Sequence, residues 1–340
     1  MEERRDYTGV LAVLVVVVLI IHRRRGAASR VDGPPDEALP TYIKWKLSLL
    51  MPVRDQGPCA ACWAMSVADM MADQLNVRTN GAYGIRPLSA QYILNCTPSS
   101  GCGVGGSPEE VYNLPQLTVQ GVPLEADVPY TGTVQKCAPV PPGAFRVRTV
   151  RGTALNLCDD PANALPSMRA SIIRANVQRM RRALLHSPIV GTLRVTKDLY
   201  EYRANGVYRG GSPISPLVGY HAVEIIGFCH ESVKWAEEGF DPGYWICRSS
   251  WGLGWGVPDG VKSGFCYIEA GKNCADIESR ASICLAEMPS DLVPVAARTP
   301  QHAGAYVSYS DRAVDPDREV FVGSVCRALG GARGCHRRLV

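Results

Sequence analysis

The sequence predicts an α+β fold, with a helical part followed by a β-rich part. The run from Trp63 to Leu75 repeats apolar residues at intervals of three and four, as in a helix that buries one face. The run from His221 to Phe228 is apolar and rich in β-branched residues, as in a buried strand. With 340 residues, of which 46% are hydrophobic, the chain is long enough to bury one large core or two modest ones.

The expected helix begins directly after a cysteine, Cys62, in the segment Gln56-Gly-Pro-Cys-Ala-Ala-Cys-Trp63. A helix N-terminus has unpaired N–H groups and about half a positive charge, which stabilise a thiolate and leave donors for an oxyanion. This predicts that Cys62 is a nucleophile. The alternative is that Cys59 and Cys62 form a structural, redox or zinc-binding pair. No second Cys-x-x-Cys or His pair at ligand spacing accompanies them, so neither a metal nor another cofactor is expected.

Several motifs follow one another in the order typical of the papain family of cysteine proteases, which the chain resembles. They are the block around Cys62, the segments 88–96 and 101–106, the segment 129–132, and the runs 219–228 and 244–252. The resemblance extends from about Leu39 to about Ala286. It implies a papain-like two-lobed fold with an active-site cleft between a helical and a β-rich lobe, and hydrolysis of peptide bonds through an acyl-enzyme.

A thiol nucleophile needs a neighbouring imidazole, which forms an ion pair with it and later protonates the departing amine. His221 is the candidate among six histidines, because it opens the apolar run in a Gly-Tyr-His-Ala-Val context that matches the family. The nearest rival is His230, and a lone histidine on an apolar strand is otherwise more often a packed structural residue. The resemblance also implies that the Gln56 side chain and the Cys62 backbone N–H donate to the oxyanion.

The residue expected to orient the imidazole, after the Cys62 nucleophile and the His221 base, differs from that of the family. The family motif is Lys-Asn-Ser-Trp-Gly, and this chain has Arg248-Ser-Ser-Trp-Gly252 in its place. Ser249 therefore takes the place of an asparagine whose carbonyl accepts from the imidazole N–H. Serine is shorter, so its hydroxyl can serve only if the histidine lies closer or a water bridges the two. We expect a working but slowed enzyme. The alternative is a catalytically impaired pseudoprotease that binds peptides or a partner.

The resemblance also implies residues that contact the substrate. Gly105 and Gly106 lie where the family pairs with the substrate backbone, and Trp251 is expected in an apolar lid that keeps water from the Cys–His pair. Arg280 follows an Ile-Glu-Ser run like that of cathepsin B, which puts it at the floor of the second specificity pocket. No His-rich loop separates Gly106 from Pro129. The occluding loop of cathepsin B is therefore not expected, and an open groove implies an endopeptidase.

The chain contains 13 cysteines, a high count. The resemblance implies the disulfides Cys59–Cys102 and Cys96–Cys137. The partner of Cys274 in the third bridge of the family is missing. The remaining cysteines have no assignable partners, and sequence alone does not give their connectivity: Cys158, Cys229, Cys247, Cys266, Cys274, Cys284, Cys326 and Cys335.

The N-terminal segment carries a continuous apolar run, residues 10–21. As a helix, the uncharged stretch 7–21 is about 22 Å long, shorter than the roughly 30 Å hydrocarbon core, but flanking arginines can reach the interface. We expect a membrane anchor with a basic flank over residues 7–25, after an N-terminal flank 1–6 and before a linker 26–38. The alternative is a cleaved signal peptide and a secreted or lysosome-like enzyme.

Two features predict opposite sides of the membrane for the enzyme. The arginine-rich flank after the apolar run favours the cytosol, whereas the disulfides favour a lumenal or extracellular compartment. The peptidase domain is expected over residues 39–288 and an irregular tail over residues 289–340. The inhibitory propeptide of the family is not expected, because only the anchor and linker precede Leu39.

The net charge of the chain is only +4, and we find neither a nucleic-acid-binding motif nor a repeat. The expected partners are therefore a peptide or protein substrate and, through the N-terminal segment, a membrane. The sequence does not define the oligomeric state.

Overall fold

The computed structural model describes residue 39 and residues 42–98, 100–140, 142–203, 206–229, 243–257, 263–290 and 292. The chain divides into two compact units, residues 1–38 and 39–340, and every described residue belongs to the second. The predicted flank, anchor and linker, and nearly all of the predicted tail, therefore lie outside the described residues. Within the described ranges, no helix is long and apolar enough to cross a bilayer.

The described residues form helices, short helical turns and strands. The helices are α2 (Cys62–Arg78), α3 (Ala90–Cys96), α4 (Pro108–Val111), α5 (Pro166–Leu184) and α6 (Lys197–Tyr200). The helical turns are η2 (Leu47–Leu49), η3 (Gln116–Gln120), η4 (Pro161–Asn163) and η5 (Cys274–Asp276). The strands are β1 (Tyr42–Lys44), β2 (Val122–Pro123), β3 (Arg146–Val147), β4 (Leu155–Asn156), β5 (Ile189–Thr196), β6 (Val207–Tyr208), β7 (Leu217–Cys229), β8 (Tyr244–Arg248), β9 (Phe265–Glu269) and β10 (Ala281–Ile283).

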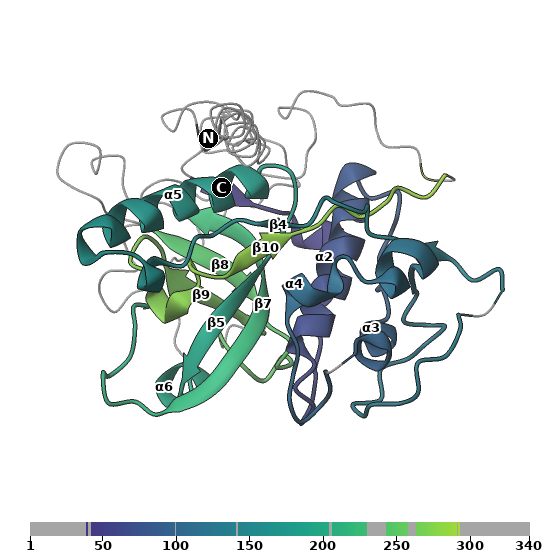
Figure 1. The fold of residues 1–340 in the computed structure, drawn as a ribbon, viewed down its shortest axis with the longest axis horizontal. Helices are drawn as coiled ribbons and strands as arrows, with labels where there is room; N and C mark the ends of the chain where they lie inside the picture. The colour runs from purple at the N-terminus through teal and green to yellow at the C-terminus, as the bar shows by residue number, and fades with distance from the viewer. Residues whose placement is uncertain are drawn as a thin grey trace, which may run out of the picture. The chain divides into compact units, whose positions relative to one another are not determined.

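Helix α2 is the centre of the helical part. It packs against the sheet strand β7 on one side and against α3 and α4 on others (Figure 1). The sequence predicts one buried face, whereas every residue of α2 except Arg78 is buried. The difference arises because α2 has neighbours on several sides. Small residues such as Ala68 and Ala72 allow these neighbours to approach closely.

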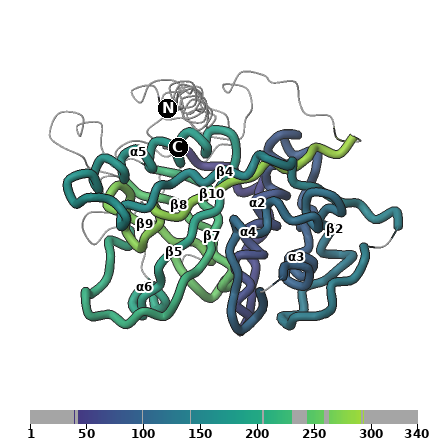
Figure 2. Tube along the Cα trace, in the orientation of Figure 1, coloured from purple at the N-terminus to yellow at the C-terminus, as the bar shows by residue number. Residues whose placement is uncertain are grey.

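The β-rich part is one mixed sheet with the strand order β4-β10-β5-β7-β8-β9-β6, in which β1 also pairs with β7. All these pairings are antiparallel except that of β6 with β9. The predicted strand 221–228 lies inside the longer β7, whose residues are buried from His221 onward. Helix α5 covers one face of the sheet (Figures 1 and 2).

Two main hydrophobic cores result. One surrounds α2 and contains Trp63, Met70 and Tyr92. The other lies between the sheet and α5 and contains Met180 and Trp245. Helices around one core and a sheet over the other agree with the predicted α+β class.

Both disulfides implied by the resemblance are present, and both lie in the helical part. Cys59–Cys102 has an S–S distance of 2.00 Å and Cys96–Cys137 one of 2.07 Å. Each bridge closes a loop of roughly 40 residues, which stabilises a folded chain by about 4 kcal/mol in the loop-entropy model. Because Cys59 is bridged, it is not available as a zinc ligand beside Cys62.

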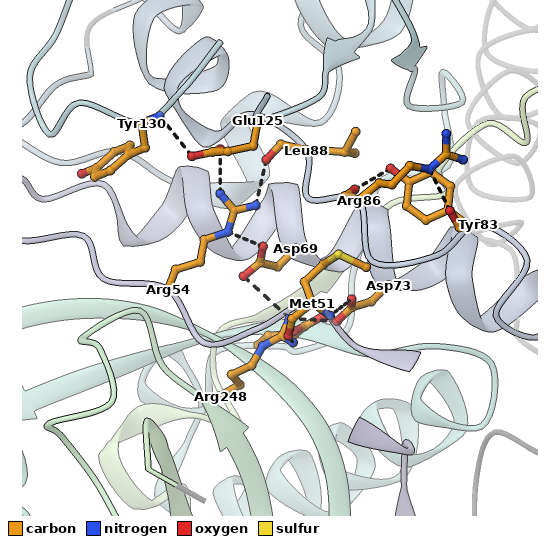
Figure 3. A network of polar contacts seen from close by, with 11 residues as sticks. Met51, Arg54, Asp69, Asp73, Tyr83, Arg86, Leu88, Glu125, Tyr130 and Arg248 are labelled. Atoms are coloured by element: carbon orange, nitrogen blue, oxygen red, sulfur yellow. Dashed lines mark hydrogen bonds and ion pairs between the residues drawn. The ribbon is translucent and has the colours of Figure 1, made fainter. Parts of the chain in front are cut away.

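A buried charge network joins the helical part to the sheet (Figure 3). Arg248 at the end of β8 contacts Asp73 of α2 at 2.8 Å, Asp69 of α2 at 3.7 Å, and Glu224 of β7. Burial raises the pKa of Asp73 to about 6, although Arg248 opposes the shift. Burial also raises the pKa of Glu224 well above its usual value. The two carboxyl groups are hydrogen-bonded to each other, and this contact lowers the pKa of Asp73 and raises that of Glu224.

A second arginine extends this network into the helical part. Arg54 donates to Asp69 at 2.7 Å, to Glu125 at 3.0 Å and to the carbonyl of Leu88 at 2.8 Å (Figure 3). All of its main partners come from distant segments of the chain. The network therefore ties α2 to the loop before it, to the segment before α3 and to the segment after β2.

Candidate active site

Cys62 is the first residue of α2 and is 8% exposed. The residue before it, Ala61, provides no side-chain cap, so the first N–H groups of the helix remain available to an anion. Burial raises the pKa of the Cys62 thiol, whereas backbone hydrogen bonds with Ala222, Trp63 and Cys62 itself lower it. The contact with Ala222 brings the thiol against β7, at the residue that follows His221 in the chain.

His221 lies on β7 and is almost fully buried. Its Nε2 is 3.0 Å from the Oγ of Ser249. Its ring stacks on the indole of Trp251, with centroids 3.9 Å apart and planes inclined by 19°. Burial lowers the pKa of His221 to about 3. The rival histidine, His230, lies outside the described residues.

Ser249 follows β8, and its hydroxyl contacts the imidazole directly. Of the two arrangements expected for the short serine side chain, a closer histidine or a bridging water, the structure has the direct contact. Its Oγ also accepts from the backbone N–H of Trp251 at 3.3 Å. A hydroxyl can donate to a neutral Nε2 as well as accept from Nε2–H, whereas an amide carbonyl can only accept. The distance to His221 is thus suitable, but serine does not by itself select one tautomer.

The amide of Gln56 is held in a defined orientation. Its Oε1 accepts from the hydroxyl of Ser250 at 2.8 Å, and its Nε2 donates to the carbonyl of Cys59 at 2.9 Å. The amide nitrogen has two N–H bonds, so one remains for an oxyanion. Sequence analysis did not assign Ser250 a role, because nothing but its place after Ser249 marks it.

Aromatic side chains pack around the imidazole. Trp251 meets Trp255 edge-on at 4.7 Å and Tyr200 edge-on at 5.3 Å between ring centroids. The N–H of the Trp255 indole donates to the carbonyl of Tyr200 at 2.9 Å. These contacts form an apolar wall next to His221. Sequence analysis missed Tyr200, since it lies on the short helix α6 and belongs to no motif.

The glycine turn lies next to the loop before Cys62. Gly105 exchanges two hydrogen bonds with Gly101, at 2.8 and 3.0 Å. A Cβ at Gly106 would lie only 2.6 Å from the ring of Trp63, so no other residue fits without displacing that indole. The turn is therefore packed against the second residue of α2, close to the nucleophile.

Arg280 precedes β10 and is exposed. Its guanidinium lies over the ring of Tyr220, 4.8 Å from the centroid, and Tyr220 directly precedes His221. In the sheet register Tyr220 is opposite a second exposed arginine, Arg194 of β5. Burial raises the pKa of Asp276, whereas Arg194 and Arg280 both lower it. The structure thus brings two arginines to this edge, of which sequence analysis named only Arg280.

Among the described residues, no group of three or more His, Cys, Asp and Glu side chains is arranged to hold a metal ion. The chemistry available at this site is that of a thiol, an imidazole, a hydroxyl and amide donors.

The sequence of the chain is similar to those of known proteins. The family model described as "Papain family cysteine protease" matches residues 39–285. The chain is 28% identical over 261 residues to Cathepsin B-like cysteine proteinase 1 of Ostertagia ostertagi, covering 72% of this chain and 71% of that protein. It is 28% identical over 225 residues to Macrodontain-1 of Ananas macrodontes, covering 64% of this chain and 86% of that protein.

Solved structures have the same fold. The bromelain protease from Ananas comosus, in complex with the E64 inhibitor, superposes with a TM-score of 0.53 at 21% identity, covering 73% of this chain and 99% of that chain. Procathepsin B from Trypanosoma congolense superposes with a TM-score of 0.55 at 20% identity, covering 78% of this chain and 85% of that chain. The predicted papain-like two-lobed α+β fold is therefore confirmed.

Proposed function

Because the chain belongs to the papain family of cysteine proteases, we propose that it is a cysteine endopeptidase that acts through Cys62 and an acyl-enzyme. The observation that carries the proposal is the placement of three groups. The Cys62 thiol, at the start of α2, contacts the backbone of Ala222. The adjacent His221 is in turn hydrogen-bonded to Ser249.

Burial opposes both charges of the expected thiolate–imidazolium pair, because it raises the pKa of Cys62 and lowers that of His221, whereas backbone hydrogen bonds with Ala222 and Trp63 favour the thiolate. The proton of the thiol passes to the imidazole as the sulfur attacks the peptide carbonyl, so the two new charges offset each other. The Cys62 N–H and the Gln56 amide stabilise the oxyanion. His221 then protonates the departing amine and later activates the water that releases the acyl group.

Covalent labelling tests this proposal. An epoxide or vinyl-sulfone probe selective for activated thiols should add one probe per chain, at Cys62, and should stop hydrolysis of a fluorogenic peptide. Mass spectrometry of the labelled chain gives both the stoichiometry and the position. Neither labelling nor hydrolysis at any pH from 5 to 8 would contradict the proposal.

Internal cleavage is the expected mode. Residues 106–129 contain no histidine, and this stretch folds into α4, η3 and β2. That supports a groove open at both ends. A peptide blocked at its N- and C-termini should therefore be cut, and release only of C-terminal dipeptides from unblocked peptides would show an exopeptidase instead.

A second candidate function is a peptide-binding pseudoprotease. The observation in its favour is that the Ser249 hydroxyl can donate to Nε2, which leaves the other imidazole nitrogen protonated and unable to accept the thiol proton. Binding of peptides without labelling or turnover would support this alternative.

Replacing Ser249 with asparagine is expected to raise kcat/KM about tenfold, or roughly 1.4 kcal/mol of transition-state stabilisation. The amide carbonyl can only accept from Nε2–H, so it selects the tautomer in which the other nitrogen receives the proton. The measurement is kcat/KM for both enzymes on one fluorogenic peptide from pH 5 to 8. Ser249→Ala, which has no hydroxyl, is the control and should be slower than the parent. An unchanged or lower rate for Ser249→Asn with normal folding would mean that the surroundings have adapted to serine.

Arg280 is expected to direct the second specificity pocket toward acidic side chains and away from Phe and Leu. A guanidinium penalises an apolar group that displaces its water, and a carboxylate can compensate it. In a positional-scanning peptide library, Arg280→Gln should reduce the preference for Asp and Glu at this subsite about tenfold. Arg148→Gln is a matched control, because Arg148 is half exposed and pairs with Glu287. Dominant Phe or Leu with the unmodified enzyme would contradict the assignment.

The N-terminal segment supports a further part of the proposal, membrane anchoring through residues 7–25. Its apolar run and arginine flank favour an anchor over a cleaved signal peptide. Carbonate extraction of membranes should retain the full chain and release a chain that starts at Leu39. Protease protection of the retained form would identify the side of the membrane.

A further inference from the structure

Two cysteines that have no predicted partner face each other across neighbouring strands. Cys247 on β8 is directly opposite Cys266 on β9. Nearby in the same ladder, the N–H of Ser249 donates to the carbonyl of Gly264 at 2.8 Å. Because hydrogen-bonded pairs alternate along an antiparallel ladder, Cys247 and Cys266 are also such a pair, with Cα atoms about 5.5 Å apart. That spacing lies within the range found for disulfides.

The two thiols are also in contact inside the core. Both side chains are fully buried between the sheet and α5. A hydrogen bond joins the Cys247 and Cys266 side chains. Within the described sheet, no other cysteine has a cysteine as its strand partner. The register therefore singles out this pair among the cysteines that sequence analysis left unassigned.

We propose that Cys247 and Cys266 form a third disulfide when the chain folds in the presence of a small-molecule disulfide such as glutathione disulfide. One cysteine thiolate attacks glutathione disulfide, which gives a mixed disulfide and releases one glutathione thiolate. The second cysteine thiolate attacks the protein sulfur of the mixed disulfide and releases the other glutathione. Two protein thiols are oxidised, one glutathione disulfide is reduced to two thiols, and the cysteine protons pass to the departing glutathione.

The bridge forms during folding rather than afterwards. Burial raises the pKa of Cys247 well above its usual value, and the thiolate is the reacting species, so exchange inside the closed core is slow. Directly opposite Cβ atoms are about 4.5–5.5 Å apart, whereas a disulfide needs about 3.8 Å. The strands must close by roughly 1 Å, which makes this bridge easier to reduce than Cys59–Cys102.

The bridge would hold a loop that supports the candidate active site. The chain between Cys247 and Cys266 carries Ser249, Trp251 and Trp255, which contact His221 or its neighbours. A covalent link between β8 and β9 closes this loop at its base. It therefore restricts the segment that holds the imidazole in place, whether or not the chain is an active peptidase.

Peptide mapping tests the pairing directly. The full chain with Cys62→Ala, which removes the reactive thiol, is refolded in glutathione buffers from oxidising to reducing. Remaining thiols are blocked with N-ethylmaleimide in denaturant before digestion with trypsin. Peptide 235–248, which contains Cys247, should be joined to peptide 263–272, which contains Cys266. The proposal fails if both peptides carry N-ethylmaleimide in the most oxidising buffer while Cys59–Cys102 is intact, or if Cys247 is joined to another cysteine.

Thermal unfolding gives a second readout in the same background. Under oxidising conditions Cys266→Ser should lower Tm by about 5–10 °C, because the bridge no longer constrains the unfolded chain. Cys284→Ser is the matched control, since Cys284 is also buried but lies just after β10, outside the paired strands. Equal losses of Tm in the two variants would mean that only packing is affected, and would contradict the bridge.

Discussion

Replacing Cys62 with alanine is expected to abolish peptide hydrolysis and to leave the fold intact. The thiol supplies the bond-forming electrons, and removal of a catalytic nucleophile commonly lowers kcat by about 10⁴-fold or more. Alanine is compatible with the first turn of α2, and Cys62 contributes little packing volume. The measurement is kcat/KM on a fluorogenic peptide, with circular dichroism and Tm recorded for the same sample.

Cys284→Ala provides the control for that experiment. Cys284 is a buried free cysteine whose carbonyl accepts from the side chain of Gln74, away from His221 and Ser249. This variant should lose some stability through packing but keep its turnover. Undiminished hydrolysis by Cys62→Ala would show that another residue is the nucleophile.

Replacing Arg248 with methionine is expected to lower the free energy of unfolding by about 3–5 kcal/mol at pH 7. Methionine is similar in length but leaves the carboxylates of Asp69, Asp73 and Glu224 buried without their shared cation. Urea denaturation measures the loss. A loss below about 1 kcal/mol would mean that water or a rearranged Arg54 compensates these carboxylates.

The same network predicts a dependence of stability on pH. Burial raises the folded-state pKa of Asp73 from 3.8 to about 6, and it raises the pKa of Glu224 well above its usual value. An acid with a raised folded-state pKa binds its proton more tightly in the folded chain. Its stabilising contribution is therefore complete below its unfolded pKa and is lost as the pH rises through its folded pKa.

Glu224→Gln isolates this effect. The glutamine amide can still donate to Asp73 but does not titrate, so the variant should lose less stability than the parent between pH 5 and pH 8. The expected difference in slope is about 1.4 kcal/mol per pH unit for one proton. Parallel stability curves for variant and parent would contradict a raised folded-state pKa of Glu224.

Local sequence predicts the elements that carry the site better than it predicts their surroundings. The position of Cys62 at the start of a helix and of His221 on an apolar strand follows from short motifs. The burial of Asp69 and Asp73 does not, because acidic residues four apart on a helix ordinarily indicate an exposed face. Their partner Arg248 is far along the chain and meets them only through the packing of α2 on the sheet.

Two further pairings that sequence analysis did not predict depend on the register of the sheet strands. Arg194 reaches Tyr220, and Cys247 reaches Cys266, because neighbouring strands align these residues. No single segment contains that information. The role of Ser249 was predicted only in part. The motif places it beside the imidazole, and the structure adds the direct 3.0 Å contact with His221.

The burial of nearly all of α2 and of β7 from His221 onward has a consequence for how activity is lost on heating. Cys62 and His221 lie on two buried elements, α2 and β7, that pack against each other, rather than on peripheral loops. Amides in such elements exchange with solvent mainly when the whole domain opens. Partial opening of the periphery should therefore spare the nucleophile and the base. Inactivation and loss of the slowest-exchanging amides are then expected to occur together, as a single cooperative event.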